Sequence, residues 1–459
     1  MNKDFKQHFQ AVSAFILGEL RTDEDSTGRR GTGMQGKGEQ AAISYSAEES
    51  AFMRFNNAKV RQSGTVTQAS LGVKLWKGPK SYSFQLGLSG DIEKDEEALA
   101  QALGQARATL PLLPDDPYQA VPEAADRSEV HYPGTLIPEA EIPTRILQPA
   151  EGMDFTGIYS QGLMCRGSAN SAGANHWFST QTFLVDYSAW LPSGKAVKSS
   201  FAGKDWNDQS YAARLAETRR ALENLGKPEK ALQPGKYRAF ISANAMMEFI
   251  PFFSWDGLGE RGIRQGESAY LALREGRERF APIFGATQDF GLGVEPAFNE
   301  DGELAPQSLR LIDGGKLANT LVCSRTAKQY GLASNNAPES EEARSIALDA
   351  GDLPEADVLA ALGTGVYVSN FHYLNWSDPA TARVTGMTRF ACLWVEDGKI
   401  VGPIKDMRWD ESLYELFGSN LERITKERHL VVENLTYDQR MVGGSLVPGI
   451  LVKGLNFTL

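Results

Sequence analysis

Apolar residues recur with two different spacings along the first part of the chain, and each spacing predicts a different kind of element. Spacing of three or four residues near the start predicts an amphipathic helix, and the same spacing returns over residues 91–110. Between them a period of two predicts an antiparallel meander with turns at Asn56-Asn57 and Lys77-Gly78-Pro79. The first helix is marked by Phe5, Phe9, Val12 and Ile16, and the strands by residues 52–55, 66–75 and 82–86.

The remainder of the chain predicts strands with few helices. Residues 111–149 are rich in proline, alanine and acids, which predicts a linker or an extended surface segment. A helix is predicted over residues 207–225, and Asp397-Gly398 is a strong hairpin signal. Further strands are predicted over residues 179–191, 198–201, 237–241, 309–312, 365–374, 389–396, 400–404 and 449–458, with an apolar run over 245–253.

The predicted strands and helices are segregated along the chain, which favours an α+β fold over a doubly wound α/β fold. We expect an N-terminal α/β region that contains the antiparallel meander, and a C-terminal domain built on a large, mostly antiparallel sheet. The predicted divisions are residues 1–115, a middle region 116–232 with linker, strands and helix, and residues 233–459.

Composition places the chain among globular proteins and limits its partners. Its 459 residues are 42% hydrophobic and 23% charged, with 47 basic and 58 acidic residues and a net charge of −11. Nucleic-acid binding is not expected, because phosphate contacts need clustered Lys and Arg. No stretch approaches the roughly 18 apolar residues that a membrane span needs. With no secretory signal near the start, we expect a soluble, cytoplasmic protein.

Five histidines and three cysteines limit metal chemistry. Cys165, Cys323 and Cys392 are far apart and predict buried thiols rather than disulfides. No two histidines have the spacing of a helical metal motif, and no serine lies in a G-x-S-x-G elbow. A triad assembled in space stays open at this point. We expect His8 and His429 to be solvated in helix-like stretches, His131 to be exposed, and His176 and His372 to be satisfied within strands.

Three further clusters have simple structural interpretations. The segment from Gly31 to Lys37 matches G-x-G-x-x-G and the start of a P-loop, but it lacks a preceding strand and Gly38 replaces the Ser or Thr that binds magnesium. We interpret it as a flexible loop. The acids at 91–93 and 339–342 predict solvated helix starts. The aromatic stretch 371–376 predicts core or interface, with a peptide-binding platform as the alternative.

Several segments together resemble the TldD/PmbA (TldD/TldE) metallopeptidase family, in family order and over nearly the whole chain. The N-terminal hairpin is similar to the family's first signature, and the later segments to its central loop, C-terminal sheet and terminal strand. These segments are Arg54-Phe55-Asn56-Asn57-Ala58-Lys59-Val60-Arg61-Gln62-Ser63; Ser324-Arg325-Thr326-Ala327-Lys328-Gln329-Tyr330-Gly331-Leu332 followed by Ser334-Asn335-Asn336-Ala337; Gly365-Val366-Tyr367-Val368; Thr385-Gly386; Trp394-Val395-Glu396-Asp397-Gly398-Lys399-Ile400; Pro403-Ile404-Lys405; and Val447-Pro448-Gly449-Ile450-Leu451-Val452-Lys453-Gly454-Leu455.

The resemblance also locates a missing metal site. TldD-type members carry zinc on a helical His-Glu-x-x-x-His motif with a later cysteine, and the motif's Glu suits a general base. Gly257-Leu258 and Ser268 place that motif here at residues 251–256. Pro251 then replaces the first histidine, Phe252 the glutamate and Asp256 the second histidine, and residues 433–437 hold no cysteine. The resemblance therefore implies a TldE/PmbA-like member without the zinc motif.

Three functions follow as hypotheses. The first is a non-catalytic subunit of a heteromeric TldD/TldE-type zinc peptidase acting on short or unfolded peptides. Zinc is then expected only in a TldD-type partner, and Pro251, Phe252, Ser254 and Asp256 are expected to line the peptide chamber. The second is a stand-alone homodimeric peptide-binding or scaffold protein with the same fold. The third, an enzyme with a relocated site near His372, Asp378 or Asp256, has no supporting residue spacing.

Overall fold

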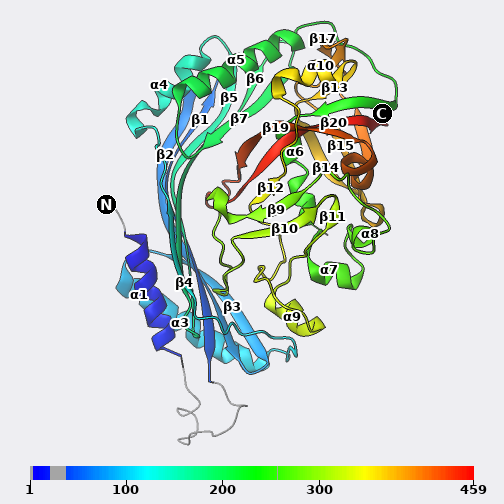
Figure 1. Ribbon diagram of the computed structural model, residues 1–459. Coiled ribbons are helices and arrows are strands. Elements are labelled where there is room, and N and C mark those ends of the chain that lie inside the picture. Colours follow the sequence, from blue (N-terminus) through cyan, green and yellow to red (C-terminus); the bar gives the residue numbers. More distant parts are fainter. Residues whose placement is uncertain (1–3, 21–37, 256, 459) are drawn as a thin grey trace, which may run out of the picture.

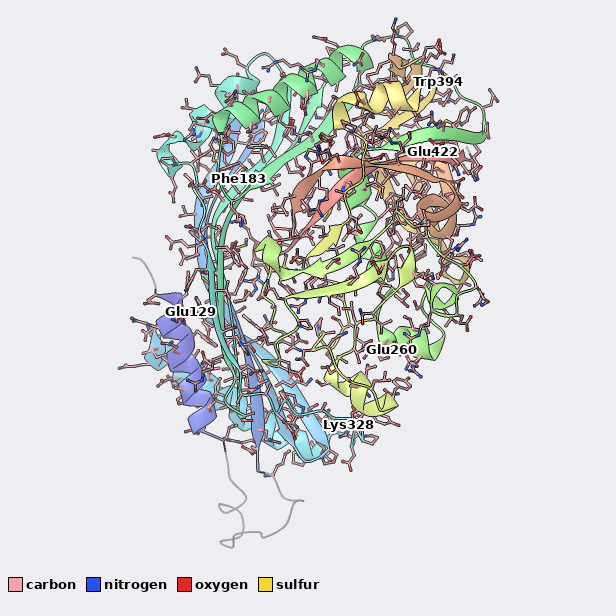
Figure 2. All side chains as sticks on the ribbon, viewed as in Figure 1. Glu129, Phe183, Glu260, Lys328, Trp394 and Glu422 are labelled. Carbon is pink, nitrogen blue, oxygen red and sulfur yellow. The ribbon has the colours of Figure 1, made fainter. Side chains whose placement is uncertain are left out.

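Two large sheets organise the chain. The computed structural model describes residues 4–20, 38–255 and 257–458. A long curved sheet with helices on its outer side stands beside a C-terminal domain, and side chains from both project into the space between (Figures 1 and 2). The fold is the predicted α+β class. The glycine-rich segment Gly31 to Lys37 lies outside the described residues.

The N-terminal sheet begins with the predicted meander, which is confirmed. At the first hairpin Asn57 and Ala58 both have φ of 50°, as a tight turn with positive φ at both central residues requires. The strand order is β3-β2-β1-β5-β6-β4, β7 also pairs with β6, and only β4 runs parallel to its neighbour. The strands are β1 (Gln40–Asn56), β2 (Lys59–Lys77), β3 (Lys80–Leu88), β4 (Arg127–Tyr132), β5 (Asp154–Asn170), β6 (Asn175–Trp190) and β7 (Ala196–Gly203).

Two of these strands were not predicted. β5 pairs with β1 and β6 along nearly its whole length and lies in the middle of the sheet. β4 lies within the segment predicted as a linker or extended surface chain, and it adds to the edge of β6. The first two predicted regions therefore both supply strands to one sheet, and the divisions at 115/116 and 232/233 stay predictions.

Helices cover the outer side of the N-terminal sheet. The first helix is confirmed, because Phe5, Phe9, Val12 and Ile16 are all buried against the sheet. The helix predicted over 207–225 is confirmed as well, with Asn207 capping its first turn. The helices of this half are α1 (Phe5–Gly18), α3 (Ile92–Thr109), α4 (Ile142–Leu147) and α5 (Asp208–Leu225), with short 3-10 turns η1 (Leu110–Leu112), η2 (Glu139–Glu141) and η3 (Gln148–Ala150).

The C-terminal sheet is large and mostly antiparallel, as predicted. Its main order is β11-β10-β9-β12-β20-β8-β13-β16-β17; β18 and β19 also pair with β20, and β14 joins through β15. Asp397 and Gly398 form the predicted hairpin turn with φ of 47° and 74°. The strands are β8 (Gly235–Ile241), β9 (Ala286–Asp289), β10 (Ser308–Asp313), β11 (Lys316–Leu317), β12 (Ile346–Leu348), β13 (Gly365–Val368), β14 (Phe371–Asp378), β15 (Arg383–Thr388), β16 (Leu393–Glu396), β17 (Lys399–Pro403), β18 (Arg408–Ser412), β19 (Leu421–Val432) and β20 (Gly444–Phe457).

Short helices connect these strands, which enclose a main apolar core and a smaller apolar cluster beside it. In the described part of the chain no helix is long and apolar enough to cross a membrane. The helices are α6 (Ala243–Met247), α7 (Glu260–Gln265), α8 (Leu271–Arg274), α9 (Ser324–Tyr330) and α10 (Val358–Leu362), with the 3-10 turns η4 (Ile250–Phe253), η5 (Phe290–Leu292), η6 (Glu355–Asp357) and η7 (Pro379–Thr381) and the π-helical turn η8 (Glu415–Ser419).

A strap formed by residues 433–443, between β19 and β20, fastens the two halves together. The buried Arg440 guanidinium donates from Nη2 to Thr182 O and Oγ1 on β6, at 3.2 and 2.8 Å, and from Nη1 to Ser50 Oγ on β1 at 3.4 Å. Its backbone N–H donates to Glu48 Oε1. Gln68 Nε2, from β2, donates to Asp438 O at 2.6 Å. The strap therefore fixes the C-terminal domain against the N-terminal sheet.

Candidate functional site

The segment at which the resemblance places the zinc motif is not a regular α-helix. Ser242 caps α6, its Oγ accepting from Ala245 N at 3.3 Å, and α6 ends at Met247. The chain then tightens into η4, where Pro251 has no N–H to extend α-helical hydrogen bonding. Phe249 anchors the segment, because its ring packs against those of Phe371, Trp409 and Phe417 at 5.6–5.9 Å.

Phe252 is buried where the resemblance expects a catalytic glutamate. Only 2% of its surface is exposed. Its ring stacks on Trp255 at 5.9 Å and meets Trp376 of β14 edge-on at 4.7 Å. Trp376 Nε1 also donates to Trp255 O at 3.2 Å. An aromatic cluster of Phe252, Trp255 and Trp376 therefore fills this position, and such rings supply apolar area rather than a proton acceptor.

The other motif positions offer no metal ligand where they are described. Pro251 is exposed and has no donor atom on its side chain. Ser254 Oγ is occupied, since it donates to Ala343 O and accepts from Ala343 N at 2.9 Å. Asp256 lies outside the described residues. The described motif positions therefore do not fit zinc.

The rest of the described chain offers no metal site either. In residues 4–20, 38–255 and 257–458, no group of three or more His, Cys, Asp and Glu is placed to hold a metal ion. The three cysteines are buried and free, as predicted. Residues 433–437, where the family's cysteine would lie, belong to the strap.

The histidines behave only partly as expected. His176 is confirmed as a satisfied strand histidine, with Ser128 Oγ at 2.8 Å and Gly302 O at 3.2 Å. His131 is exposed as expected, with 51% of its side chain accessible. Two expectations are wrong in part. His8 lies on a helix as expected, but it is mostly enclosed rather than solvated. His429 keeps 34% of its side chain accessible, but it lies on β19 rather than on a helix and contacts Glu355 Oε1 at 2.5 Å.

A relocated site near His372 gains no support. His372 Nε2 contacts Arg389 Nη1 at 2.9 Å, and burial together with the Arg389 charge lowers the pKa of His372. Asp378 closes a turn at the far end of β14, accepting from Ala380 N and Thr381 Oγ1. The structure therefore does not bring His372 and Asp378 together as a base and its orienting acid.

The acids at 339–342 were also interpreted wrongly as a solvated helix start. No helix follows them in the described chain. Glu341 is buried and accepts from the backbone N–H groups of Arg261 at 2.8 Å and Cys323 at 3.1 Å. Glu341 thus satisfies two loop donors and is a structural residue.

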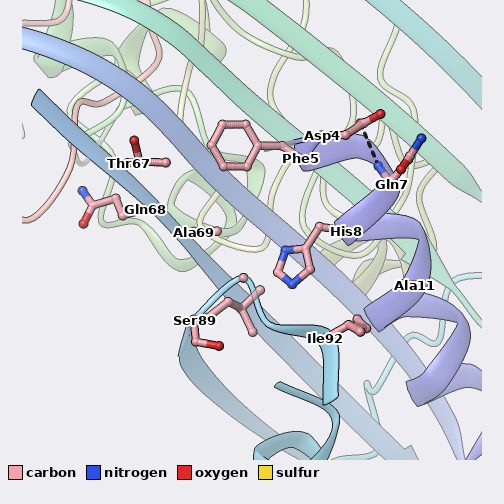
Figure 3. A pocket seen from close by; sticks show the side chains of 12 residues that line it. Asp4, Phe5, Gln7, His8, Ala11, Thr67, Gln68, Ala69, Ser89 and Ile92 are labelled. Carbon is pink, nitrogen blue, oxygen red and sulfur yellow. Dashed lines mark hydrogen bonds between the residues drawn. The ribbon is translucent and has the colours of Figure 1, made fainter. Parts of the chain in front are cut away.

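A cavity of about 400 Å³ beside α1 presents another candidate, shown in Figure 3. His8 lies between α1 and the turn that carries Ser89. Its Nε2 is 3.0 Å from Asp95 Oδ2 and its Nδ1 is 3.2 Å from the Tyr45 hydroxyl. Asp95 also accepts from Ser89 N and Gly90 N, at 2.7 and 2.9 Å. These groups satisfy one another, so we interpret them as a structural clasp rather than a reactive triad.

Replacing His8 by Ala is expected to lower the free energy of unfolding by about 1–3 kcal/mol, because Asp95 and Tyr45 each lose a buried hydrogen-bond partner. Urea denaturation measures the change. His131→Ala is the matched control and should change stability by less than about 0.5 kcal/mol, since that ring is exposed. If both variants lost the same free energy of unfolding, His8 would not have the structural role that the clasp implies.

Comparison with known proteins places this geometry in a family. The profile of the PmbA/TldA metallopeptidase C-terminal domain matches residues 234–459, which contain the whole C-terminal sheet and the segment 251–256. The chain belongs to the PmbA/TldD metallopeptidase family. No curated protein matches it at a significant level.

Solved structures of this family share the fold over nearly the whole chain. TldE from Thermococcus kodakarensis superposes with a TM-score of 0.72 at 14% identity, over 92% of this chain and 97% of that one. Proteins described as modulators of DNA gyrase from Thermotoga maritima MSB8 and Bacteroides thetaiotaomicron VPI-5482 give TM-scores of 0.73 and 0.74, each at 14% identity. The first covers 98% of this chain and 99% of its own, and the second 100% and 99%. The architecture of this PmbA/TldD-family chain is thus close to that of TldE.

Proposed function

We propose that this chain is the non-catalytic, TldE-type subunit of a heteromeric TldD/TldE-type zinc peptidase that acts on short or unfolded peptides. The main support for the proposal is that the aromatic cluster of Phe252, Trp255 and Trp376 occupies the segment at which the resemblance places the zinc motif. Phe252 occupies the position of the general base, and neither Pro251 nor the engaged Ser254 hydroxyl can replace a metal ligand. In this proposal zinc and the catalytic water belong to a TldD-type partner.

The strand beside the motif supports a role in holding peptide. Among the described strands β14 pairs with β15 alone, so its other edge is available for strand addition. Its side chains alternate, with Tyr373, Asn375 and Ser377 exposed and Trp376 joined to the motif segment. Tyr373 is 77% exposed and Trp255 48%. These aromatic faces, with Pro251, Phe252, Ser254 and Asp256, are the proposed chamber lining.

The test is to purify this chain alone and together with a TldD-type protein, and to measure mass, zinc content and cleavage of an unfolded peptide. We expect a mixed complex that binds zinc and cleaves, while this chain alone does neither. A partner in which the first motif histidine is replaced by alanine is the control, and its complex should assemble without activity.

Two results would overturn the proposal. Stoichiometric zinc with hydrolysis by the lone chain would make it an enzyme in its own right. A stable homodimer that binds peptide and never joins a TldD-type protein would instead favour the stand-alone binding or scaffold protein.

A further inference from the structure

A segment of the C-terminal domain, residues 293–303, lies against the N-terminal sheet and is held there by polar contacts. Its carbonyl groups accept hydrogen bonds from side chains of β5 and β6. The donors are Ser168 Oγ to Glu300 O at 3.3 Å, Asn170 Nδ2 to Asp301 O at 3.1 Å and Thr180 Oγ1 to Gly293 O at 2.9 Å. We call residues 299–303, at the end of this segment, the docking loop.

The docking loop is a compact turn that brings one acid to the sheet. Asn299 Oδ1 accepts from the backbone N–H groups of Asp301 and Glu303, at 3.1 and 3.0 Å. Gly302, with φ of 79°, completes the turn. The turn directs the Asp301 side chain toward Lys74 on β2, whose Nζ lies 3.5 Å from Asp301 Oδ2.

Lys74 is shared between two carboxylates, and the more buried one has the longer contact. Its Nζ lies 2.6 Å from Glu339 Oε2, whose side chain is 48% exposed, whereas the Asp301 side chain is 15% exposed. Asp301 Oδ1 is buried and has no hydrogen-bond partner among the described residues. An ionised Asp301 is therefore incompletely compensated, and burying such a charge is costly.

The other charges around Asp301 do not supply the missing compensation. A cavity of about 20 Å³, with room for about one water molecule, separates the docking loop from α9. Glu303 also lines it, while Arg325, the second cation along its described wall, is paired with Asp116 at 3.1 Å. Burial raises the pKa of the Cys323 thiol on the same wall, so this group is neutral.

The acidity of Asp301 agrees with this geometry. Burial raises the pKa of Asp301 to about 7, with Lys74 opposing the shift and Glu300, Glu303 and Glu339 adding to it. The free carboxyl has a pKa of about 3.9, so the docked loop holds the proton more tightly than an undocked loop would.

We propose that the contact between the docking loop and the N-terminal sheet is a pH-sensitive latch, closed while Asp301 is protonated and opened when Asp301 ionises. The stabilisation from the proton is complete below about pH 4 and is lost as the pH rises through about 7. Burial lowers the pKa of the neighbouring His176, so its contact with Gly302 O stays that of a neutral ring above neutral pH. The strap holds the two halves together independently, because Arg440 stays charged over this range.

The experiment is hydrogen exchange of the complete chain at about pH 6 and about pH 8, with rates corrected for the intrinsic effect of pH. A carboxyl whose docked pKa is about 7 makes the opening equilibrium of residues 299–303 about tenfold larger at the higher pH. Amides of the strap, residues 433–443, are the internal reference and should keep their protection.

Two variants connect the change to this contact. Asp301→Asn keeps the side-chain shape without the charge, so the docking loop should be equally protected at both pH values. Glu339→Gln leaves Lys74 to Asp301 alone and should move the midpoint of opening to lower pH. Asp352→Asn is the matched control, since this acid is exposed and paired with Arg423 at 3.1 Å, and it should keep the tenfold change.

Equal protection of the docking loop at both pH values in the unchanged protein would overturn the inference, as would an Asp301→Asn variant that still opens at the higher pH. An unchanged midpoint in Glu339→Gln would overturn the shared role of Lys74. These measurements need neither zinc nor a partner, so they leave the proposed function untouched and the two proposals fail separately.

Discussion

Replacing Arg440 by Met is expected to lower the free energy of unfolding by about 3–5 kcal/mol, the range for removing one partner from a buried charged network. The guanidinium is enclosed enough that burial lowers the pKa of Arg440 to about 10. Its loss leaves the carbonyl oxygen of Thr182 and the hydroxyl of Ser50 without this donor, and removes a positive charge from the neighbourhood of the buried Glu48 carboxylate. Equilibrium denaturation in urea measures the loss.

Arg423→Met is the control for this variant. Arg423 makes an exposed ion pair with Asp352 at 3.1 Å, and such pairs contribute about 0–1 kcal/mol. If the two variants were equally stable, the strap would not be what holds the C-terminal domain to the N-terminal sheet.

Phe252→Glu, which restores the family's acidic residue, is expected to destabilise the protein by about 3–5 kcal/mol and to recruit no zinc. The substitution removes a buried ring from between Trp255 and Trp376 and places a carboxylate in their apolar surroundings. Chemical denaturation gives the stability, and metal analysis gives the zinc content.

The acidity of the new side chain provides a second measurement. Desolvation would raise its folded-state pKa above the unfolded value of about 4.3, so the native state would hold the proton more tightly. The charge-related part of the loss should therefore be absent below about pH 4 and grow as the pH rises. Phe252→Leu carries no charge and should lose about 1 kcal/mol at every pH. A pH-independent loss in Phe252→Glu would show that position 252 is open to water.

The fold could be predicted from the sequence where the spacing of apolar residues matches the face that an element buries. The α1 helix and the β1–β3 meander follow directly from apolar periods of four and two. β5 was missed because glycines interrupt its pattern. Those glycines are required by the close approach of neighbouring strands and by the local backbone conformation. A Cβ at Gly157 would lie 2.1 Å from Asp186 O, and Gly162 has φ of 146°. These requirements for glycine depend on contacts between strands, which the local sequence pattern does not contain.

The candidate site was also only partly predictable, because its contacts join residues that are far apart in the sequence. Family resemblance drew attention to Pro251 and Phe252, but Trp376, which completes the aromatic cluster, comes from more than a hundred residues later. His8 was misjudged for the same reason, since Asp95 is brought to it by a separate helix.

The position of β20 has a consequence for how the protein is made. This strand lies in the middle of the C-terminal sheet, pairing with β8, β12, β18 and β19, yet it follows all of them along the chain. During synthesis β8 and β12 leave the ribosome long before the strand that joins them exists. The N-terminal sheet, complete by residue 203, can form earlier. The C-terminal half must therefore wait with open strand edges, and it is the half on which we expect chaperones to act.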